Sequence, residues 1–349
     1  MSNSVKSYID VMGQGMANAD YVPNAKLLKN WKPSKITLAL LHRVHGFATG
    51  MKRRSTYIKS QKIVWLEGGN PHGEPLLLIH GFASNKENWV MLLPFLMKRY
   101  RLFVPDLPGW GESTFDFAES YRIEDQISRL ETWSQRYLPE DFHVVGSSMG
   151  GAIAALLAVR QPDQVRSLTL MNALGVFGDE LTYFERELQQ GRNQLVAERL
   201  TDVVHMISTV TSYRRWALTA FLAPLMYQEL VSRQHINFYM SHQLIKNAPS
   251  DIFESIATIK PPTFVLWGEN DRILHRSCAD VFKQLIPHAE VKILRDAGHL
   301  PMIEMPALTA RSLQKFWSNS ESNLARYVAK NKLKGSATSS AVQVDAVYH

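Results

Sequence analysis

Short apolar runs with strand character alternate with helical patterns along most of this chain, and this alternation restricts the folds open to it. The clearest runs cover residues 76–79, 102–105, 142–145, 167–171, 263–267 and 290–294. Alternating polar and β-branched or aromatic residues over 57–66 predict two earlier strands around a turn at 60–61. Helical patterns cover 86–98, 123–137, 149–160, 277–285 and 307–317. The alternation predicts an α/β fold, with a mostly parallel eight-stranded sheet covered by helices on both faces.

The alternation stops between residues 175 and 251, where helical patterns carry many methionine and aromatic residues. These include Trp216, Phe221, Met226, Tyr227, Phe238, Tyr239 and Met240. The segment is predicted to form a helical cap over the carboxyl edge of the sheet, with some apolar groups lining a pocket for acyl chains. The predicted core then covers 55–174 and 252–318. It is preceded by an extension over 1–54 and followed by a basic tail over 319–349 that is predicted to be disordered.

Positive charge is concentrated in the predicted extension. The formal net charge is +7, and residues 1–54 carry nine Lys or Arg against Asp10 and Asp20. The remainder is neutral, which argues against a nucleic-acid groove on the folded body. Apolar residues at helical spacing over 36–51 predict a basic amphipathic helix. This helix either packs against the main domain or lies on an anionic membrane surface.

The cellular location follows from features that the sequence lacks. Its first thirty residues have no apolar run typical of a secretory signal, and no stretch approaches the roughly 18 apolar residues of a membrane span. The single cysteine, Cys278, excludes an internal disulfide and fits a reducing compartment. We therefore expect a cytoplasmic protein. Peripheral contact of the extension with the inner face of the membrane is the alternative.

The segment 146–151, Gly-Ser-Ser-Met-Gly-Gly, joins a predicted strand directly to a predicted helix. A nucleophilic serine needs a sharp strand-to-helix turn with small residues two positions away on either side. Gly146 and Gly150 flank Ser148 in this way, whereas Val145 stands two residues before Ser147. We therefore predict that Ser148 is a nucleophile. The backbone N–H of Met149, at the start of the helix, would point toward a developing oxyanion.

A serine nucleophile requires a base, and the base requires an orienting carboxylate. Asp271 and His299 follow the last two predicted strands, so both belong at the carboxyl edge of the sheet. We predict His299 as the base and Asp271 as its partner. Glu269 and Asp296 are the nearby alternatives to Asp271.

Two further loops are predicted to border this site. A buried strand ends in His80-Gly81-Phe82, which makes the N–H of Phe82 the second oxyanion donor beside Met149. His80 is predicted to brace that loop, and Asp106 to hold backbone N–H groups in the loop after the next strand. No cofactor is expected. The loop around Gly109 lacks a complete dinucleotide fingerprint, and no carboxylate or thiolate accompanies His42 and His45, so we predict no metal site.

Over residues 57–317 these motifs together resemble the α/β-hydrolase superfamily. The sequence around 73–89, including Gly-Glu-Pro-Leu-Leu-Leu-Ile-His-Gly-Phe and Asn-Lys-Glu-Asn-Trp, is similar to bacterial lipases and esterases and to mammalian monoacylglycerol lipases of the α/β-hydrolase-domain family. The resemblance implies the same triad and oxyanion donors, and glycerolipid esters as substrates. Relatives in that branch usually carry a secretion signal or a membrane span, and this basic extension departs from them.

The sequence thus predicts a serine carboxylic-ester hydrolase, a lipase or esterase that acts on a small-molecule acyl ester through an acyl-serine intermediate. Two alternatives stay open. One uses the same triad to hydrolyse a carbon–carbon bond in a vinylogous diketone, because some of those hydrolases share the Gly-x-Ser-Met-Gly-Gly motif. The other is a binding protein on the hydrolase fold without catalytic activity.

Overall fold

A computed structural model describes residues 49–139, 141–190, 192–212, 216–246 and 252–319. The chain divides into two units, residues 1–310 and 311–349, and the described part of the second, 311–319, is helical. Most of the predicted amphipathic helix and nearly all of the predicted tail lie outside the described residues. Among the described helices, none combines the length and the apolar character that crossing a membrane requires.

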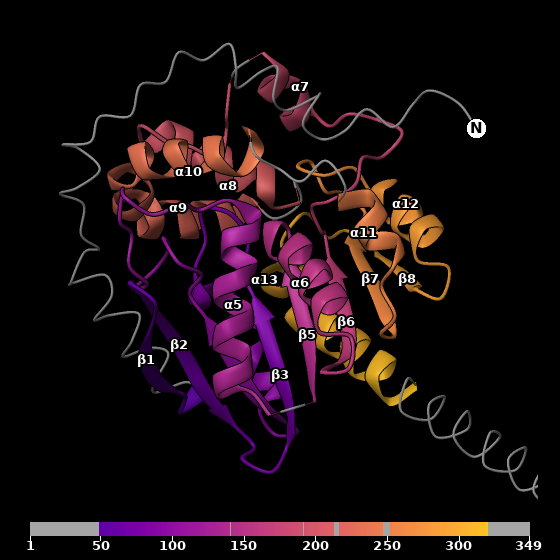
Figure 1. The fold of residues 1–349 in the computed structure, drawn as a ribbon. Helices are drawn as coiled ribbons and strands as arrows, with labels where there is room; N and C mark the ends of the chain where they lie inside the picture. Colours follow the sequence, from indigo (N-terminus) through magenta and orange to yellow (C-terminus); the bar gives the residue numbers. More distant parts are fainter. Residues whose placement is uncertain (1–48, 140, 191, 213–215, 247–251, 320–349) are drawn as a thin grey trace, which may run out of the picture. The chain divides into compact units, whose positions relative to one another are not determined.

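An eight-stranded sheet forms the centre of the first unit (Figure 1). Its strands are β1 (Lys52–Ile58), β2 (Gln61–Gly69), β3 (Glu74–Ile79), β4 (Tyr100–Pro105), β5 (Phe142–Ser147), β6 (Val165–Met171), β7 (Thr263–Gly268) and β8 (Glu290–Leu294). They are ordered β1-β2-β4-β3-β5-β6-β7-β8 across the sheet. The pairs β1–β2 and β2–β4 are antiparallel, and the other five are parallel. The prediction of a mostly parallel eight-stranded sheet is confirmed.

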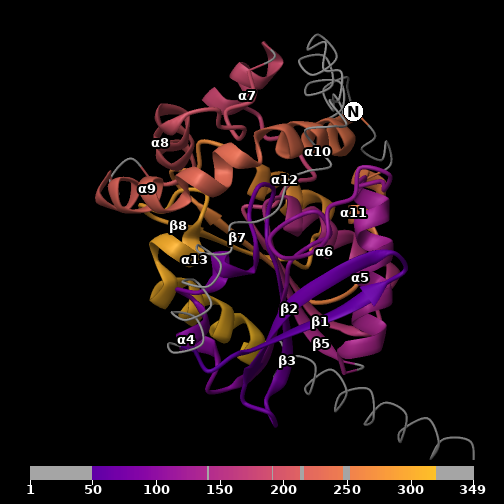
Figure 2. The ribbon, with the colours of Figure 1, turned by 90° about the vertical axis from the view of Figure 1, so that its left-hand side faces the viewer.

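Helices cover both faces of this sheet (Figure 2). One face carries α5 (Ile123–Tyr137), α6 (Met149–Arg160) and α11 (Ile252–Ala257), and the other carries α4 (Leu93–Leu96) and α13 (Pro301–Glu304). The 3₁₀ helix η1 (Lys86–Trp89) contacts α13, β3 and β4. A further helix, α12 (Cys278–Leu285), packs against β7 and β8. Residues 149–158 of α6 are all buried, so this helix is apolar on every side rather than amphipathic.

The edge of the sheet begins earlier than the sequence pattern indicates. Strand β1 starts at Lys52, so residues 52–54 belong to the sheet and not to the extension that was predicted to end at residue 54. Five of its seven residues are exposed, because β1 pairs only with β2. Charged side chains on an exposed edge strand limit pairing with other chains, and they also hide the apolar pattern of a strand.

One predicted helix is wrong. The sequence pattern over 86–98 indicates a single helix, but the structure has η1 and α4 with a break between them. Pro94 lies in the first turn of α4. Proline is tolerated there because its missing N–H would have no helical partner, whereas inside a continuous helix it would remove a hydrogen bond.

Among the described residues, four helices lie between β6 and the short helix α11. They are α7 (Tyr183–Gln189), α8 (Leu200–Val210), α9 (Trp216–Ser232) and α10 (Gln234–Lys246). Figure 1 shows α8, α9 and α10 gathered over one end of the sheet. Helices α8 and α9 share a small core of their own, which includes Val203, Ile207 and Leu230. Met240 of α10 instead joins the main core, so this insertion is packed onto the sheet domain.

Candidate active site

Ser148 lies at the turn between β5 and α6, in a backbone conformation that few residues other than glycine adopt. Its φ is 56° and its ψ is −123°. Such strained residues cluster at functional sites, and this one marks a sharp strand-to-helix turn that exposes the serine side chain. Ser148 is partly exposed, whereas Ser147 is only 1% exposed. Ser148 is therefore the serine of this motif that a substrate can reach.

Two glycines allow this turn to close tightly. A Cβ atom on Gly146 would lie 2.1 Å from the carbonyl oxygen of Gly150. A Cβ atom on Gly150 would lie 2.4 Å from the carbonyl oxygens of Ile79 and His80. Any larger residue at either position would separate β3, β5 and α6, which explains the spacing of the motif around Ser148.

Asp271 and His299 follow β7 and β8, and the two side chains are hydrogen-bonded. His299 Nδ1 donates to Asp271 Oδ2 at 2.8 Å. The other oxygen, Oδ1, accepts from the backbone N–H groups of Ile273 at 2.8 Å and Leu274 at 3.1 Å. Both side chains are buried. Because the Nδ1 proton is held by a carboxylate, the neutral imidazole presents Nε2 as a proton acceptor.

Glu269 and Asp296, the alternatives to Asp271, are not the hydrogen-bond partners of His299 Nδ1. Glu269 Oε2 accepts the backbone N–H of Asp296 at 3.4 Å, and Asp271 is the carboxylate whose oxygen contacts the imidazole of His299.

Asn172 is a residue of this site that the sequence analysis missed. It follows β6 with a φ of 45°, and its Nδ2 donates to Asp271 Oδ2 at 2.6 Å. The same nitrogen lies 3.4 Å from the carbonyl oxygen of Gly298, the residue before His299. Asn172 therefore fixes the carboxylate and the histidine loop together. Its position at the carboxyl end of a parallel strand was the available signal.

Glu304 is a second missed residue, and it holds the backbone around His299. Its carboxylate accepts the N–H of Gly298 at 3.0 Å, the N–H of Leu300 at 3.2 Å and the N–H of Ser212 at 2.7 Å. Gly298 and Leu300 flank the histidine on both sides, and Ser212 follows α8. Glu304 is buried, so these hydrogen bonds compensate for removing its charge from water. No sequence motif that we used points to it.

The two residues predicted to donate backbone N–H groups to an oxyanion, Phe82 and Met149, belong to segments that border Ser148. A Cβ atom on Gly81 would lie 3.0 Å from Ser148 Cβ, so the loop after β3 runs beside the serine. Met149 is the first residue of α6, where N–H groups have no partner within the helix. Within the described part of the chain, the N–H groups of Phe82 and Met149 donate to no backbone carbonyl of a turn or loop. Both are thus available to an anionic oxygen.

His80 links the loops that follow β3 and β4. Its Nε2 accepts the N–H of Leu107 at 2.9 Å, and its Nδ1 lies 2.8 Å from the carbonyl oxygen of Gly81. This pairing requires the neutral ring with the proton on Nδ1. Burial lowers the pKa of His80 to about 4, and nearby Asp106 only partly opposes this shift. Both of these ring contacts reach backbone groups, and the ring also packs edge-on against Trp110, with the centroids 6.1 Å apart.

Asp106 lies at the centre of a buried ion cluster. It accepts the backbone N–H groups of Lys86 at 2.7 Å and Glu112 at 2.9 Å, and it pairs with Lys86 Nζ at 2.8 Å. Lys86 also contacts Glu87 and Glu112 at 3.0 Å each. Burial alone would lower the pKa of Lys86, but the three carboxylates outweigh it and raise that pKa above its ordinary value. No sequence motif predicts this buried lysine.

Clusters of metal-binding side chains are absent from the described residues. Across these ranges, no group of three or more His, Cys, Asp or Glu side chains could hold a metal ion. His42 and His45, which were not expected to bind a metal, lie outside these ranges.

Family comparison agrees with this architecture. A model of the alpha/beta hydrolase fold family matches residues 74–306, and the chain belongs to that family. The resemblance drawn from the sequence motifs is confirmed, and so is the predicted enzyme class, a hydrolase of carboxylic esters.

Individual relatives are lipases and related hydrolases. The chain is 33% identical to Lipase 1 of Psychrobacter immobilis, over 75% of this chain and 83% of that protein. It is 26% identical to the Homo sapiens monoacylglycerol lipase ABHD6, over 76% of this chain and 82% of that protein. Among solved structures, a membrane phospholipase A matches with a TM-score of 0.75 and 30% identity, covering 82% of this chain and 93% of the other. A meta-cleavage product hydrolase from Pseudomonas fluorescens IP01, at 22% identity and a TM-score of 0.66, shows the shared fold alone.

Proposed function

We propose that this protein is a serine lipase or esterase that cleaves an acyl-glycerol ester through an acyl-enzyme on Ser148. The observation that carries the proposal is the strained turn at Ser148, combined in one sheet with a buried Asp271–His299 pair whose hydrogen bond measures 2.8 Å. A strained serine on such a turn, with an oriented imidazole from a neighbouring strand end, is the arrangement that acyl transfer requires.

In the proposed reaction, His299 Nε2 removes the hydroxyl proton of Ser148 as the oxygen attacks the ester carbonyl carbon. The tetrahedral oxyanion is held by the N–H groups of Phe82 and Met149. Its collapse breaks the bond to the alcohol, which takes the proton from His299 and leaves. Water, deprotonated by His299, then attacks the acyl-serine, and the carboxylic acid leaves as Ser148 recovers its proton.

Asp271 supports this cycle by holding the imidazole in one tautomer and by stabilising the imidazolium that forms. Four hydrogen bonds reach its carboxylate: two from the backbone N–H groups of Ile273 and Leu274, one from Asn172 and one from His299. Their geometry leaves the carboxylate few alternative orientations, so the imidazole is positioned before substrate binds.

A monoacylglycerol or a similar glycerolipid is the proposed substrate. Two of the relatives described above are named for lipase or monoacylglycerol lipase activity. The insertion 175–251 supports the same choice, because Tyr239 of α10 lies beside the loop after β4. Its half-buried ring packs against Phe115, which is also half-buried. Apolar groups of this kind suit an acyl chain.

Replacing Ser148 with alanine tests the mechanism. We expect Ser148→Ala to lower turnover of p-nitrophenyl butyrate by a factor on the order of 10⁴ or more, because the nucleophile is lost. Ser147→Ala removes the neighbouring buried hydroxyl and should retain most of the activity. If Ser148→Ala kept ordinary turnover, or Ser147→Ala alone abolished it in a folded protein, the proposed nucleophile would be wrong.

A further inference from the structure

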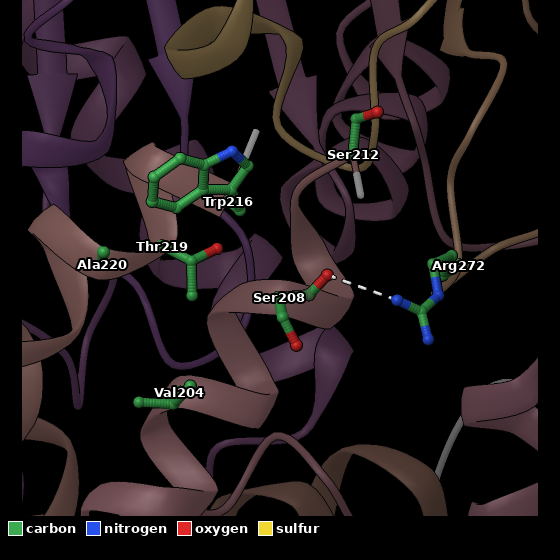
Figure 3. Close-up of a pocket in the computed structure, with 7 residues that line it drawn as sticks. All are labelled: Val204, Ser208, Ser212, Trp216, Thr219, Ala220 and Arg272. Atoms are coloured by element: carbon green, nitrogen blue, oxygen red, sulfur yellow. Dashed lines mark hydrogen bonds between the residues drawn. The ribbon is translucent and has the colours of Figure 1, made fainter. Parts of the chain in front are cut away.

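A pocket of about 380 Å³ lies between α8 and α9, beside the loop that carries Asp271. Its lining residues are Val204, Ser208, Ser212, Trp216, Thr219, Ala220 and Arg272. Figure 3 shows α9 contributing Trp216, Thr219 and Ala220 on one side, with Arg272 entering from the opposite side. Its volume falls within the range of roughly 300–1,000 Å³ that is typical of small-molecule sites.

One side of this pocket is apolar and open to solvent. Trp216 is 75% exposed and Val204 is 43% exposed, although both are large apolar side chains. Their helices already have a core, in which Val203, Met206 and Ile207 of α8 face Ala223 and Leu230 of α9. Trp216 and Val204 therefore lie outside that core, and the apolar surface they leave in water favours an apolar ligand.

Among the described lining residues, Arg272 on the opposite side carries the positive charge. The guanidinium of Arg272 lies 3.5 Å from the carbonyl oxygen of Ser208, at the limit of a hydrogen bond. In the described part of the chain, Arg272 is in contact with no carboxylate. The remaining polar groups of the lining are the hydroxyl-bearing residues Ser208, Ser212 and Thr219. A guanidinium with free donors matches the planar oxygens of a carboxylate or phosphate.

The pocket is also joined to the candidate active site through the backbone. Ser212 donates its N–H to Glu304, whose carboxylate also holds Gly298 and Leu300 on either side of His299. The N–H of His299 in turn donates to the carbonyl oxygen of Val210, at the end of α8, at 2.9 Å. Arg272 directly follows Asp271. A ligand in the pocket would thus contact segments that position both residues.

We propose that this pocket binds an anionic amphiphile, with its carboxylate or phosphate group on Arg272 and its hydrocarbon chain against Val204, Ala220 and Trp216. The charge and the apolar wall together select this class, because a neutral lipid would leave the arginine unpaired and a small anion would leave the apolar wall in water. This inference rests on the proposed function only for the origin of the ligand, because hydrolysis of an acyl ester at Ser148 would release a fatty acid.

Quenching of Trp216 fluorescence tests the site without turnover. The Ser148→Ala protein is titrated with 9,10-dibromostearate, a brominated fatty acid that quenches nearby indoles, and with the uncharged 9,10-dibromostearyl alcohol. We expect saturable quenching by the acid that disappears in Ser148→Ala/Trp216→Phe. In the Ser148→Ala protein that keeps Trp216, the additional substitution Arg272→Gln should weaken the apparent affinity for the acid by about tenfold or more. The apparent affinity for the alcohol should change little.

Matched variants separate this site from a general charge effect. Arg276→Gln removes an equal charge from the same loop at an exposed position, and it should leave the titration unchanged. Arg272→Lys keeps the charge without the planar fork and should give an intermediate affinity. Competition with hexadecanoate and with hexadecyl phosphate identifies the preferred anion, and displacement by either one supports the site.

Equal affinity for the acid and the alcohol, or equal effects of Arg272→Gln and Arg276→Gln, would overturn the proposal. Quenching that persists after Trp216→Phe would also overturn it, since the ligand would then lie elsewhere. Because binding is measured on a protein without Ser148, these outcomes do not depend on whether Ser148 is the nucleophile.

Discussion

Individual side chains of the candidate site are each held by several neighbours, and these contacts fix the position of His299. The imidazole contacts Asp271 on one side, and the peptide groups before and after it are bound by Glu304. A base that must reach a hydroxyl within hydrogen-bonding distance depends on such restraint, because an error of about 1 Å can lower a rate by roughly 100-fold.

Glu304→Gln tests this restraint. The amide nitrogen would face backbone N–H groups where a carboxylate oxygen now accepts them, so the loop around His299 should shift. We expect kcat for a soluble ester to fall by a factor on the order of 10 to 100, with KM changed much less. Glu290→Gln, an exposed carboxylate on β8, is the matched control and should leave both constants unchanged. A proportional rise in KM with kcat intact would contradict a positioning role.

Sequence alone could propose Ser148, Asp271 and His299, because each stands in a local pattern at the end of a predicted strand. Asn172 also follows a predicted strand but belongs to no motif, and Glu304 has neither signal. Their roles arise from contacts with residues 99 and 92 positions away, Asp271 and Ser212, and the sequence does not reveal those contacts. Residues that act through a local motif were predictable, and those that act through tertiary contacts were not.

At the scale of elements, the loops after β3 and β4 are joined by a buried neutral histidine. His80 bridges Gly81 and Leu107, and its ring can accept the Leu107 N–H only while Nε2 is unprotonated. The buried cluster of Lys86 and Asp106 joins η1 to the same loop. The sequence patterns located the strands well, because buried parallel strands are continuous apolar runs. They failed for the predicted helix over 86–98, where Pro94 interrupts the pattern, and at the charged edge strand β1.

His80 also gives a pH dependence of stability. Its pKa falls from 6.5 to about 4 on folding because of burial, so the unfolded chain binds a proton that the folded protein binds only at lower pH. This contribution to the free energy of unfolding is fully present above pH 6.5 and is lost as the pH falls through 4. Its total size is about 3 kcal/mol.

Urea unfolding at pH 7 and at pH 4.5 measures this contribution. We expect His80→Gln to lose less free energy of unfolding than the wild type over this interval, and His72→Gln, at an exposed histidine, to follow the wild type. If the free energy of unfolding fell equally in His80→Gln and in the wild type between pH 7 and pH 4.5, His80 would not be the source of this pH dependence.

For the molecule as a whole, the sheet supplies a rigid edge, and in the proposed function the insertion over it supplies the surface that a substrate meets. The fold class was predictable because the buried parallel strands and most of the helices that cover them leave a local signal. The arrangement of α7–α10 was not, since helices with apolar residues on several sides do not show which side faces the sheet. Met240 of α10 joins the main core, whereas Trp216 of α9 is left exposed.

Trapping the acyl-enzyme tests the central claim most directly. The protein is mixed with p-nitrophenyl butyrate, quenched in acid within milliseconds and digested, and the peptides are analysed by mass spectrometry. We predict a butyryl group on Ser148 that is absent from the Ser148→Ala protein and that decays as butyrate is released. Rapid p-nitrophenol release with no acyl group on Ser148, or with the acyl group on another residue, would contradict the account.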